Sequence, residues 1–311
     1  MLYFNYEGII MEIDKLNLLR KKYTICNTIC YSIAIILNIL FVILCKREII
    51  SLSFSYYFVL PFTLIFSLIF AGFPGLKYAR EYTILYKNYF VYNALKEIFT
   101  DLEYEPEKGI SEETLRDTKM IDTSDRYYSN DYIKGKYKDV NFESSDVHIE
   151  EEHEREDKDG NKETHYVTLF MGRWFIFDFN KTFKSNLCVS QTSSVIRFYD
   201  LNYEKINLED EQFNKNFLVY AQNEHEAFYI LSPSFMEKIK DLSLKINGKL
   251  ILCFNNNKLY LGLNNYLDSF EPSMHKKVNE TIIKNAIKKD IDVIINFIEQ
   301  LDLDNDLFKE D

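Results

Sequence analysis

The chain has 311 residues, and its 48 acidic side chains outnumber its 37 basic ones, which gives a formal net charge of −11 at pH 7. This acidity argues against a nucleic-acid-binding protein, which would present a basic face to phosphates. The five cysteines form no CxxC pair and no dense framework, so a disulfide-stapled exported domain is not expected.

Two long uncharged runs dominate the first quarter of the chain. Residues 23–45 and 49–76 contain no Asp, Glu, Lys, Arg or His. Each run exceeds the roughly 20 residues that a helix needs to cross the hydrocarbon of a bilayer. We therefore predict an antiparallel transmembrane hairpin over 23–76, with spans at about 23–45 and 51–73. The second span should end at the helix stop Gly72-Phe73-Pro74-Gly75.

The residues that flank the hairpin predict its orientation. Residues 1–22 are expected to contain an interfacial helix, because Leu16, Leu19 and Tyr23 share one helical face. Basic residues gather before the first span and after the second: Lys15, Arg20, Lys21, Lys22, Lys77, Arg80 and Lys87. The positive-inside rule then predicts a multi-pass protein of the inner cell membrane with both termini in the cytoplasm.

Three residues inside the spans are predicted to act in packing within the bilayer. Asn27 and Asn38 lie among Ile and Leu, where an amide needs a hydrogen-bond partner. Pro61 should kink the second span. The sequence leaves two arrangements open: the amides join the two spans of one chain, or they join copies in a homo-oligomer.

Residues 77–130 are predicted to form a helical connector. Apolar residues recur at helical spacing over residues 76–102, and Pro106 interrupts the pattern. Ser111 is a suitable N-cap for a short helix. Residues 124–135 are rich in turn-forming side chains and are expected to be a bridge into the next domain.

Residues 131–303 predict a soluble α+β domain, followed by an acidic tail at 304–311. A period of two in β-branched and aromatic residues favours strands at 140–149, 164–179, 187–189, 195–199 and 217–220, and a hairpin at 249–254 and 258–263. Residues 209–213 are expected to be a polar turn, and helices are expected at 233–244 and 278–303. The predicted fold is a mainly antiparallel sheet with a C-terminal helix, and a PH-like barrel is one topology for it.

The last helix carries an apolar seam with spacing 4-3-4-3, formed by Ile287, Ile291, Ile294, Ile298 and Leu301. A heptad seam of this length either docks onto the protein's own sheet or pairs two chains in a coiled coil.

A strongly charged segment, residues 150–163, joins two of the predicted strands. Acidic side chains outnumber basic ones there, and Asp157-Lys-Asp-Gly-Asn161 suits a hairpin turn. Such a tip is either a solvated hairpin end or an attachment point for a basic partner.

Few residues point to chemistry. His148, His153 and His165, with the neighbouring glutamates 150–152, are the best metal candidates. The offset of five between His148 and His153 places them on opposite faces of a strand and fits neither helical zinc motif. Asp178, Asn180 and Lys181 form either a ligand-binding corner or a turn that satisfies its own backbone. The chain has no P-loop, GxGxxG or GxSxG motif, so we predict no cofactor and favour a non-enzymatic role.

Several short segments occur in an order that resembles a known family. They are Asp131-Tyr-Ile-Lys-Gly135, Thr168-Leu-Phe-Met-Gly172, Phe177-Asp-Phe-Asn-Lys-Thr-Phe183, Phe213-x3-Phe217-x-Val219-Tyr220, Glu226-Ala-x2-Ile230-Leu-x-Pro233-x2-Met236 and Phe254-x4-Leu259-Tyr260. Over about residues 80–275 the chain is similar to the bacterial family called domain of unknown function 3137. The family's Gly-rich "GLF" segment reads Met171-Gly172-Arg173-Trp174-Phe175 here.

The resemblance implies a bacterial membrane protein with two spans and no assigned activity, so no catalytic residues carry over. It also implies a LemA-family membrane protein as a partner.

Three functional interpretations follow from the sequence. The leading one is a membrane-anchored cytoplasmic domain that binds or scaffolds another protein. The second is a ligand-sensing effector that oligomerises through its transmembrane hairpin. The third is a hydrolase whose site is assembled in space from distant residues.

Overall fold

The computed structural model describes residues 6–46, 56–118, 121, 125–156, 162–178, 184–191 and 203–303. The chain divides into two compact units. Unit 1 comprises Met1–Val91 with Glu271–Ala286, and unit 2 comprises Tyr92–Phe270 with Ile287–Asp311.

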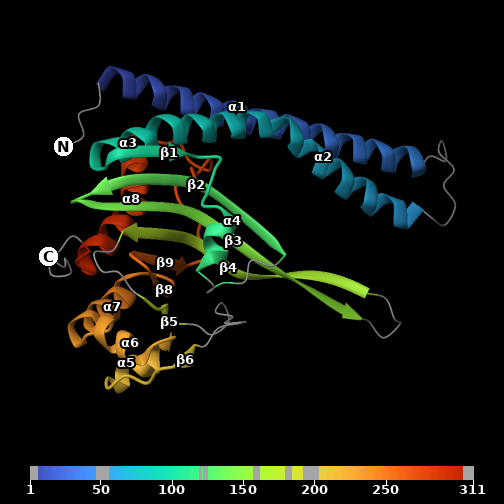
Figure 1. The fold of residues 1–311 in the computed structure, drawn as a ribbon. Coiled ribbons are helices and arrows are strands. Elements are labelled where there is room, and N and C mark those ends of the chain that lie inside the picture. Colours follow the sequence, from blue (N-terminus) through green and yellow to red (C-terminus); the bar gives the residue numbers. More distant parts are fainter. Residues whose placement is uncertain are drawn as a thin grey trace. The chain divides into compact units, whose positions relative to one another are not determined.

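Unit 1 is built on two long helices that lie side by side, α1 (Tyr6–Lys46) and α2 (Tyr56–Leu85) (Figure 1). Asn38 donates a 2.7 Å hydrogen bond from Nδ2 to Ser67 Oγ, and nearer the other end Asn27 faces Gly75. Contacts that move forward on one helix and backward on the other define an antiparallel pair. The predicted hairpin is therefore present, and the Asn38 amide joins the two helices of one chain. Its role in a bilayer stays a prediction, as does that of Asn27.

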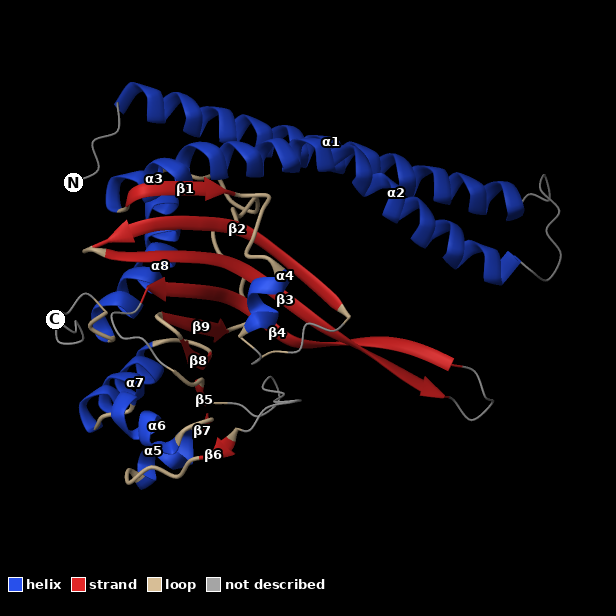
Figure 2. Cartoon of the chain, in the orientation of Figure 1, coloured by secondary structure: helices blue, strands red, loops and turns tan. Residues whose placement is uncertain are grey.

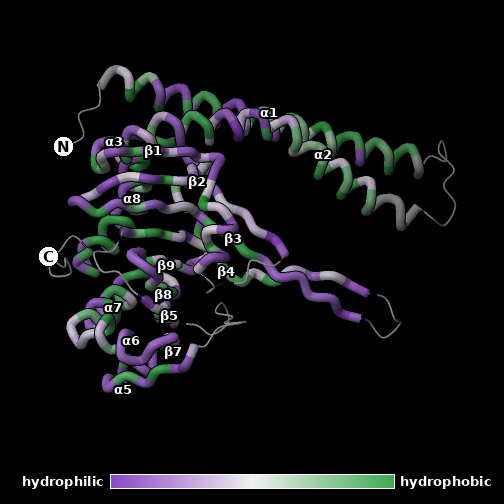
Figure 3. The backbone as a smooth tube through the Cα atoms, viewed as in Figure 1, coloured by the Kyte–Doolittle hydropathy of each residue, from purple (hydrophilic) through white to green (hydrophobic). Residues whose placement is uncertain are grey.

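Most of the paired length of these helices carries exposed apolar side chains. On α1 they include Ile25, Ile29, Ile33, Ile36, Leu37, Ile39, Leu40 and Ile43, and on α2 Phe62, Ile65, Phe66, Ile69, Phe70 and Phe73. Figure 3 shows this hydrophobic stretch in green toward the end of the helices near their connection. By length and composition, both helices are able to cross a membrane.

Two details of the hairpin differ from the prediction. The N-terminal interfacial helix is no separate element, because α1 is continuous from Tyr6, and Leu16 and Leu19 are buried inside the protein. The expected stop at residues 72–75 is wrong, because α2 runs through Pro61 and Pro74 to Leu85 and continues as the π-helix η1 (Tyr86–Val91).

A segment from late in the chain packs against the charged ends of the two helices and completes unit 1. Asn17 forms hydrogen bonds of 2.9 and 3.1 Å with the backbone of Val278, and the Tyr82 hydroxyl donates to the Ser273 carbonyl. The buried Lys87 side chain pairs with Glu271.

Unit 2 is a sheet of nine described strands in the order β1-β2-β3-β4-β9-β8-β5-β7-β6, and every neighbouring pair is antiparallel (Figure 2). The strands are β1 (Thr100–Glu105), β2 (Arg126–Tyr137), β3 (Val140–Glu156), β4 (Lys162–Asp178), β5 (Leu187–Ser190), β6 (Glu204–Lys205), β7 (Leu218–Ala221), β8 (Lys249–Asn255) and β9 (Lys258–Asn264). The order is linear with β1 and β6 at its ends, so the described strands form an open sheet and not a closed barrel.

The short helix α3 (Tyr92–Ile98) precedes β1, and further helices connect the strands: α4 (Glu112–Asp117), α5 (Glu211–Asn216), α6 (Glu224–Ile230) and α7 (Pro233–Lys245). The predicted cap is present, since the side chain of Ser111 accepts a hydrogen bond from the first turn of α4, and Ser232 caps α7 in the same way. The last helix, α8 (Glu280–Gln300), enters unit 2 at Ile287. Its whole apolar seam is buried, and Phe297 packs edge-on against Phe175 of β4 at 4.8 Å between ring centroids. The seam therefore docks onto the protein's own sheet.

Three stretches of unit 2 differ from the prediction. Residues 124–135 are not a turn-rich bridge, because they contain most of β2, and residues 100–105 are a strand where a helix was expected. The polar turn at 209–213 is largely helix α5, capped by Asp210. The strand expected at 195–199 lies outside the described residues.

Candidate functional site

A buried polar cluster lies where β2, β3 and β4 run side by side. Arg173 of β4 is opposite Asp146 of β3, and Asp146 is in turn opposite Asn130 of β2. Arg173 and Asp146 expose only 2% and 4% of their surface, and Asp131 exposes none. Buried charges are costly unless they are paired and hydrogen-bonded, so their partners decide what this cluster can do.

Arg173 joins all three strands. Its Nη1 lies 3.3 Å from Asp146 Oδ2, and its Nη2 donates to the Asp131 carbonyl at 3.1 Å. Nε and Nη2 also donate to Ser144 Oγ. The guanidinium carbon lies 4.8 Å from the centre of the Phe270 ring, within cation–π range.

Asp131 is held in a bulge of β2. The register between β2 and β3 shifts between Asn130 and Ile133, and Asp131 has a φ of 52°. The bulge turns its backbone N–H away from the strand ladder toward the Pro106 carbonyl at 3.1 Å. Its carboxylate accepts from the Tyr104 hydroxyl at 2.7 Å and from the Asn130 amide at 3.0 Å. Burial, together with the Asp131 carboxylate, raises the pKa of Tyr104 far above its usual range, so this hydroxyl stays protonated.

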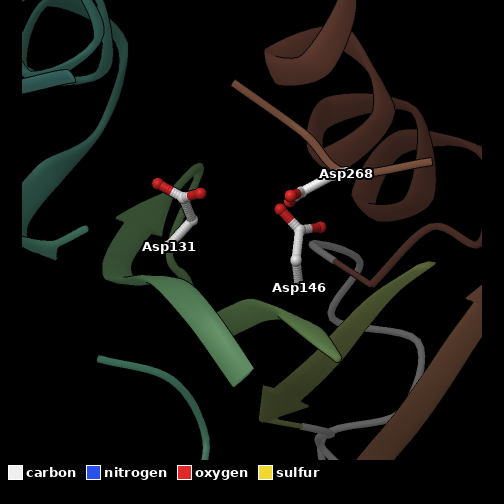
Figure 4. Close-up of side chains that lie close together, drawn as sticks. All are labelled: Asp131, Asp146 and Asp268. Carbon is white, nitrogen blue, oxygen red and sulfur yellow. The ribbon is translucent and has the colours of Figure 1, made fainter. Parts of the chain in front are cut away.

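Asp146 binds the loop that follows β9. Ser269 donates to it twice, from the backbone N–H at 2.9 Å and from Oγ at 3.1 Å. Figure 4 shows the carboxylate of Asp268 turned toward that of Asp146. Burial raises the pKa of Asp146 to about 7; Arg173 opposes this shift, and the carboxylates of Asp131 and Asp268 reinforce it. Near neutral pH, Asp146 is therefore protonated for part of the time, in addition to its contact with Arg173.

Oxygen atoms of Asp131, Asp146 and Asp268 lie within 4.8 Å of one another, and carboxylates are the ligands that hard cations prefer. Asp131 and Asp146 nevertheless already accept hydrogen bonds from protein donors, and Arg173 supplies positive charge inside the group. The arrangement is that of a structural ion-pair network, which fastens the β2 bulge, β3, β4 and the loop at 268–270 to one another.

A second feature is the outer end of the β3–β4 hairpin, here called the arm, residues 151–156 and 162–167. The ladder between β2 and β3 ends at Glu150, and the ladder between β4 and β9 starts at Gly172. The arm strands therefore pair with each other alone and extend beyond the rest of the sheet (Figure 2). Its described charges are five acidic and two basic: Glu151, Glu152, Glu154, Glu156 and Glu163 against Arg155 and Lys162.

The arm separates the three histidines predicted as metal ligands. His153 and His165 are opposite each other, with ring centroids 5.5 Å apart, and Glu151 contacts His153. His148 contacts Thr168 instead, at 3.3 Å, and its ring lies beside that of Tyr128 in a tilted arrangement. The odd offset along β3 puts His148 on the opposite face from His153, as the sequence indicated. Metal binding by any of them stays a prediction.

The other predicted site residues are only partly placed. Asp178 ends β4 as an exposed side chain and accepts a 2.9 Å hydrogen bond from Asn141, whereas Asn180 and Lys181 lie outside the described residues. Cys188 and Cys253 are cross-strand partners in the core, with sulfurs 3.3 Å apart. Among the described histidines, none is hydrogen-bonded to either thiol.

The sequence interpretation missed Asp131, Asp146 and Arg173. A signal was present: Arg173 is the lone charge in the apolar strand Leu169–Phe177, and a charge there must be buried against a partner. The partner itself was hidden, because Asp146 sits in a polar stretch that resembles any solvated strand.

Fold and cluster together define a class: an α+β protein in which two long apolar helices precede an open antiparallel sheet with a polar network in its interior. The sequence model of the family described as "Protein of unknown function (DUF3137)" matches residues 168–303, which confirms the resemblance over that segment. No curated protein matches the chain. Among solved structures, the chain is similar to the crystal structure of the mycobacterial trehalose monomycolate transport factor A, TtfA. The identity is 8% and the TM-score 0.37, over 70% of this chain and 93% of that one.

Proposed function

We propose that this protein is a membrane-anchored module whose α+β domain binds a basic protein partner through the arm. The observation that carries the proposal is the arm itself, a two-stranded ribbon whose strands pair only with each other among the described strands and whose exposed side chains are mainly acidic. Like charges held close together on a ribbon repel one another, and a basic surface would relieve that repulsion.

The internal polar groups support a binding role over a catalytic one. Arg173 and Asp146 already bond to each other, to Ser144 and to Ser269. A substrate would have to break these bonds in order to bind either group. The surplus charge of unit 2 lies outside, where a macromolecule can reach it.

The anchoring half of the proposal rests on the exposed apolar faces of α1 and α2, which are far larger than the scattered apolar residues of a soluble surface. We further propose that both helices cross the inner cell membrane, with both termini in the cytoplasm as the basic flanks predict. A membrane protein of the LemA family is the partner that the family resemblance implies.

The test is photo-crosslinking in the cells that make the protein. A photoreactive amino acid replaces Thr164, which is exposed on the arm, and in a second strain it replaces Lys249, which is exposed at the start of β8. The proposal predicts a specific adduct from position 164 that is absent from position 249. Mass spectrometry should identify the adduct as a protein with a basic surface.

Charge variants test whether binding depends on the acidic residues of the arm or on the overall negative charge of the protein. The arm variant carries Glu154→Gln, Glu156→Gln and Glu163→Gln, and the matched control carries Glu211→Gln, Glu224→Gln and Asp241→Asn, three exposed acids on helices α5, α6 and α7. The adduct should be lost in the arm variant and kept in the control. Two results would refute the proposal: equal adduct yield from position 164 in the arm variant and the control variant, or no protein adduct from position 164 in the unmodified protein.

A further inference from the structure

Two histidines face each other across the arm. His153 of β3 and His165 of β4 are direct partners in the antiparallel register, and their rings lie 5.5 Å apart between centroids with 26° between their planes. Directly opposite side chains have Cβ atoms about 4.5–5.5 Å apart. Both histidines are exposed, so an ion can reach them from solvent.

The separation of the rings suits one shared metal ion. Because a zinc–nitrogen bond is about 2.0–2.1 Å long, each ring centroid lies about 3 Å from the metal, and two rings at a tetrahedral angle have centroids about 5 Å apart. The observed spacing is close to that value. The χ2 torsion of histidine is broad, so the His165 ring can turn toward an ion held at His153 without movement of the backbone.

Glu151 is placed to orient one of the rings. Its Oε2 lies 3.0 Å from His153 Nε2, and its own side chain is only 16% exposed. The two residues are two apart on one strand and share a face. When a carboxylate accepts the N–H of one ring nitrogen, the other nitrogen keeps its lone pair and a fixed direction. Proteins orient metal-binding histidines in this way.

We propose that His153 and His165 bind one divalent transition-metal ion of the Zn²⁺, Ni²⁺ and Cu²⁺ class on this face of the arm, with Glu151 as a positioning residue. Imidazole nitrogen suits these ions and not Mg²⁺ or Ca²⁺, which prefer oxygen ligands. Water completes the coordination. The site uses residues of this chain alone and does not depend on the proposed partner.

A bound ion has a mechanical consequence for the arm. Two-stranded ribbons are marginally stable by themselves, and the arm strands pair only with each other among the described strands. An ion that joins one histidine from each strand closes the ribbon and offsets part of the surrounding negative charge. Metal availability then controls how well the arm is ordered.

His148 provides a matched control, because it lies on the other face of β3 and contacts Thr168 and Glu150. Zn²⁺ binding to the full-length protein in detergent is measured by isothermal titration calorimetry, with Mg²⁺ as the comparison ion. We expect one site that His148→Gln retains and that His153→Gln and His165→Gln each weaken by at least about tenfold. Glu151→Gln should weaken it by about tenfold, the usual effect of removing an orienting partner.

Hydrogen exchange supplies a second readout that is independent of the calorimetry. Zn²⁺ should slow amide exchange at residues 151–156 and 162–167 of the wild-type protein, and this protection should disappear in His153→Gln. The fluorescence of Trp174, which is buried in the sheet far along β4 from the arm, checks that each variant is folded. No Zn²⁺ binding, unchanged affinity in His153→Gln, equal loss in His148→Gln, or Zn²⁺ that leaves the arm amides unprotected would each overturn the proposal.

Discussion

Replacing Arg173 with Met tests the buried network most directly. Methionine replaces the unbranched apolar stem of arginine, but it removes the guanidinium that contacts Asp146, Ser144 and the Asp131 carbonyl. Breaking a buried ion pair from one side typically costs 3–5 kcal/mol, because the remaining charge loses its partner. We expect Arg173→Met to lower the free energy of unfolding by about that much at pH 8.5.

The loss of unfolding free energy caused by Arg173→Met should grow as pH rises, because the substitution changes the pKa of Asp146. A carboxyl whose pKa is raised in the folded state holds its proton more tightly there than in the unfolded chain, so stability falls as pH rises from about 4 to the folded pKa. In the wild type that fall ends at about pH 7. Without Arg173 the pKa of Asp146 rises further and the fall continues. One pKa unit is worth 1.36 kcal/mol, so the variant should lose up to about 2 kcal/mol more than the wild type between pH 7 and pH 8.5.

The assay is chemical unfolding of the full-length protein in detergent, followed by fluorescence. Trp174 is the single tryptophan of the chain and is fully buried beside Arg173, so its emission reports unit 2 specifically. Arg126→Met is the matched control, because Arg126 is exposed and pairs with Glu150 at 3.6 Å. An exposed pair contributes no more than about 1 kcal/mol. Equal destabilisation by the two substitutions, or a cost of Arg173→Met that does not grow between pH 5.5 and pH 8.5, would refute the reasoning.

Three further substitutions or treatments test other parts of unit 2. Asp146→Asn mimics the protonated carboxyl, so it should be nearly neutral at pH 5 and should remove the loss of stability that the wild type shows between about pH 4 and pH 7, measured by the same unfolding assay. Burial raises the pKa of the Cys188 thiol, so Cys188 and its neighbour Cys253 should resist iodoacetamide at pH 8 until denaturant is added, as read by mass spectrometry. Gly262→Ala should cost about 1–3 kcal/mol in thermal unfolding, because the added methyl would lie 2.5 Å from the Trp174 ring.

Local patterns were sufficient to predict those elements that have strong periodicity or clear end signals. The helix hairpin followed from two uncharged runs, and the β3–β4 and β8–β9 hairpins followed from alternating residues around polar turns. The seam of α8 followed from its 4-3-4-3 spacing. In each case the information lies within a few neighbouring residues, where side-chain direction is set by the geometry of a single helix or strand.

Long-range contacts explain the failures. The polar residues from Arg126 to Asp131 resemble a turn, yet a strand forms there because β3 pairs with Arg126 to Asn130, and β1 pairs with the residues of β2 that follow. Helix α2 continues through Gly72, Pro74 and Gly75, although these residues favour a stop. The glycines have a second purpose there: a Cβ on Gly72 would meet the Tyr31 hydroxyl at 3.1 Å, and one on Gly75 would overlap Asn27. Glycines that allow close helix contact and glycines that end helices look alike in sequence.

The buried cluster could not be predicted from the sequence either, because its members come together only through long-range contacts. Asp131 reaches Arg173 only because a bulge turns it, and Asp146 reaches Ser269 only because β9 lies beside β4. Partners separated by 27 to 123 residues leave no spacing to recognise. His153 and His165 show the contrary case: they were found as a set, and the hairpin register then selected the pair and excluded His148.

The distribution of polar groups indicates which part of unit 2 is able to bind a partner or an ion. The two carboxylates buried in the described sheet are already bonded to donors, Asp131 to Tyr104 and Asp146 to Ser269. The part-buried Asp290 of α8 likewise accepts from the backbone N–H of Phe270. These bonds stabilise the fold, and breaking one to bind a ligand would leave a buried charge without a partner. The arm carries the opposite arrangement, with acids and imidazoles held in solvent on a ribbon that the core does not need. Binding there breaks none of the buried bonds, so selection for a partner or an ion can change the arm while the buried network of the sheet stays intact.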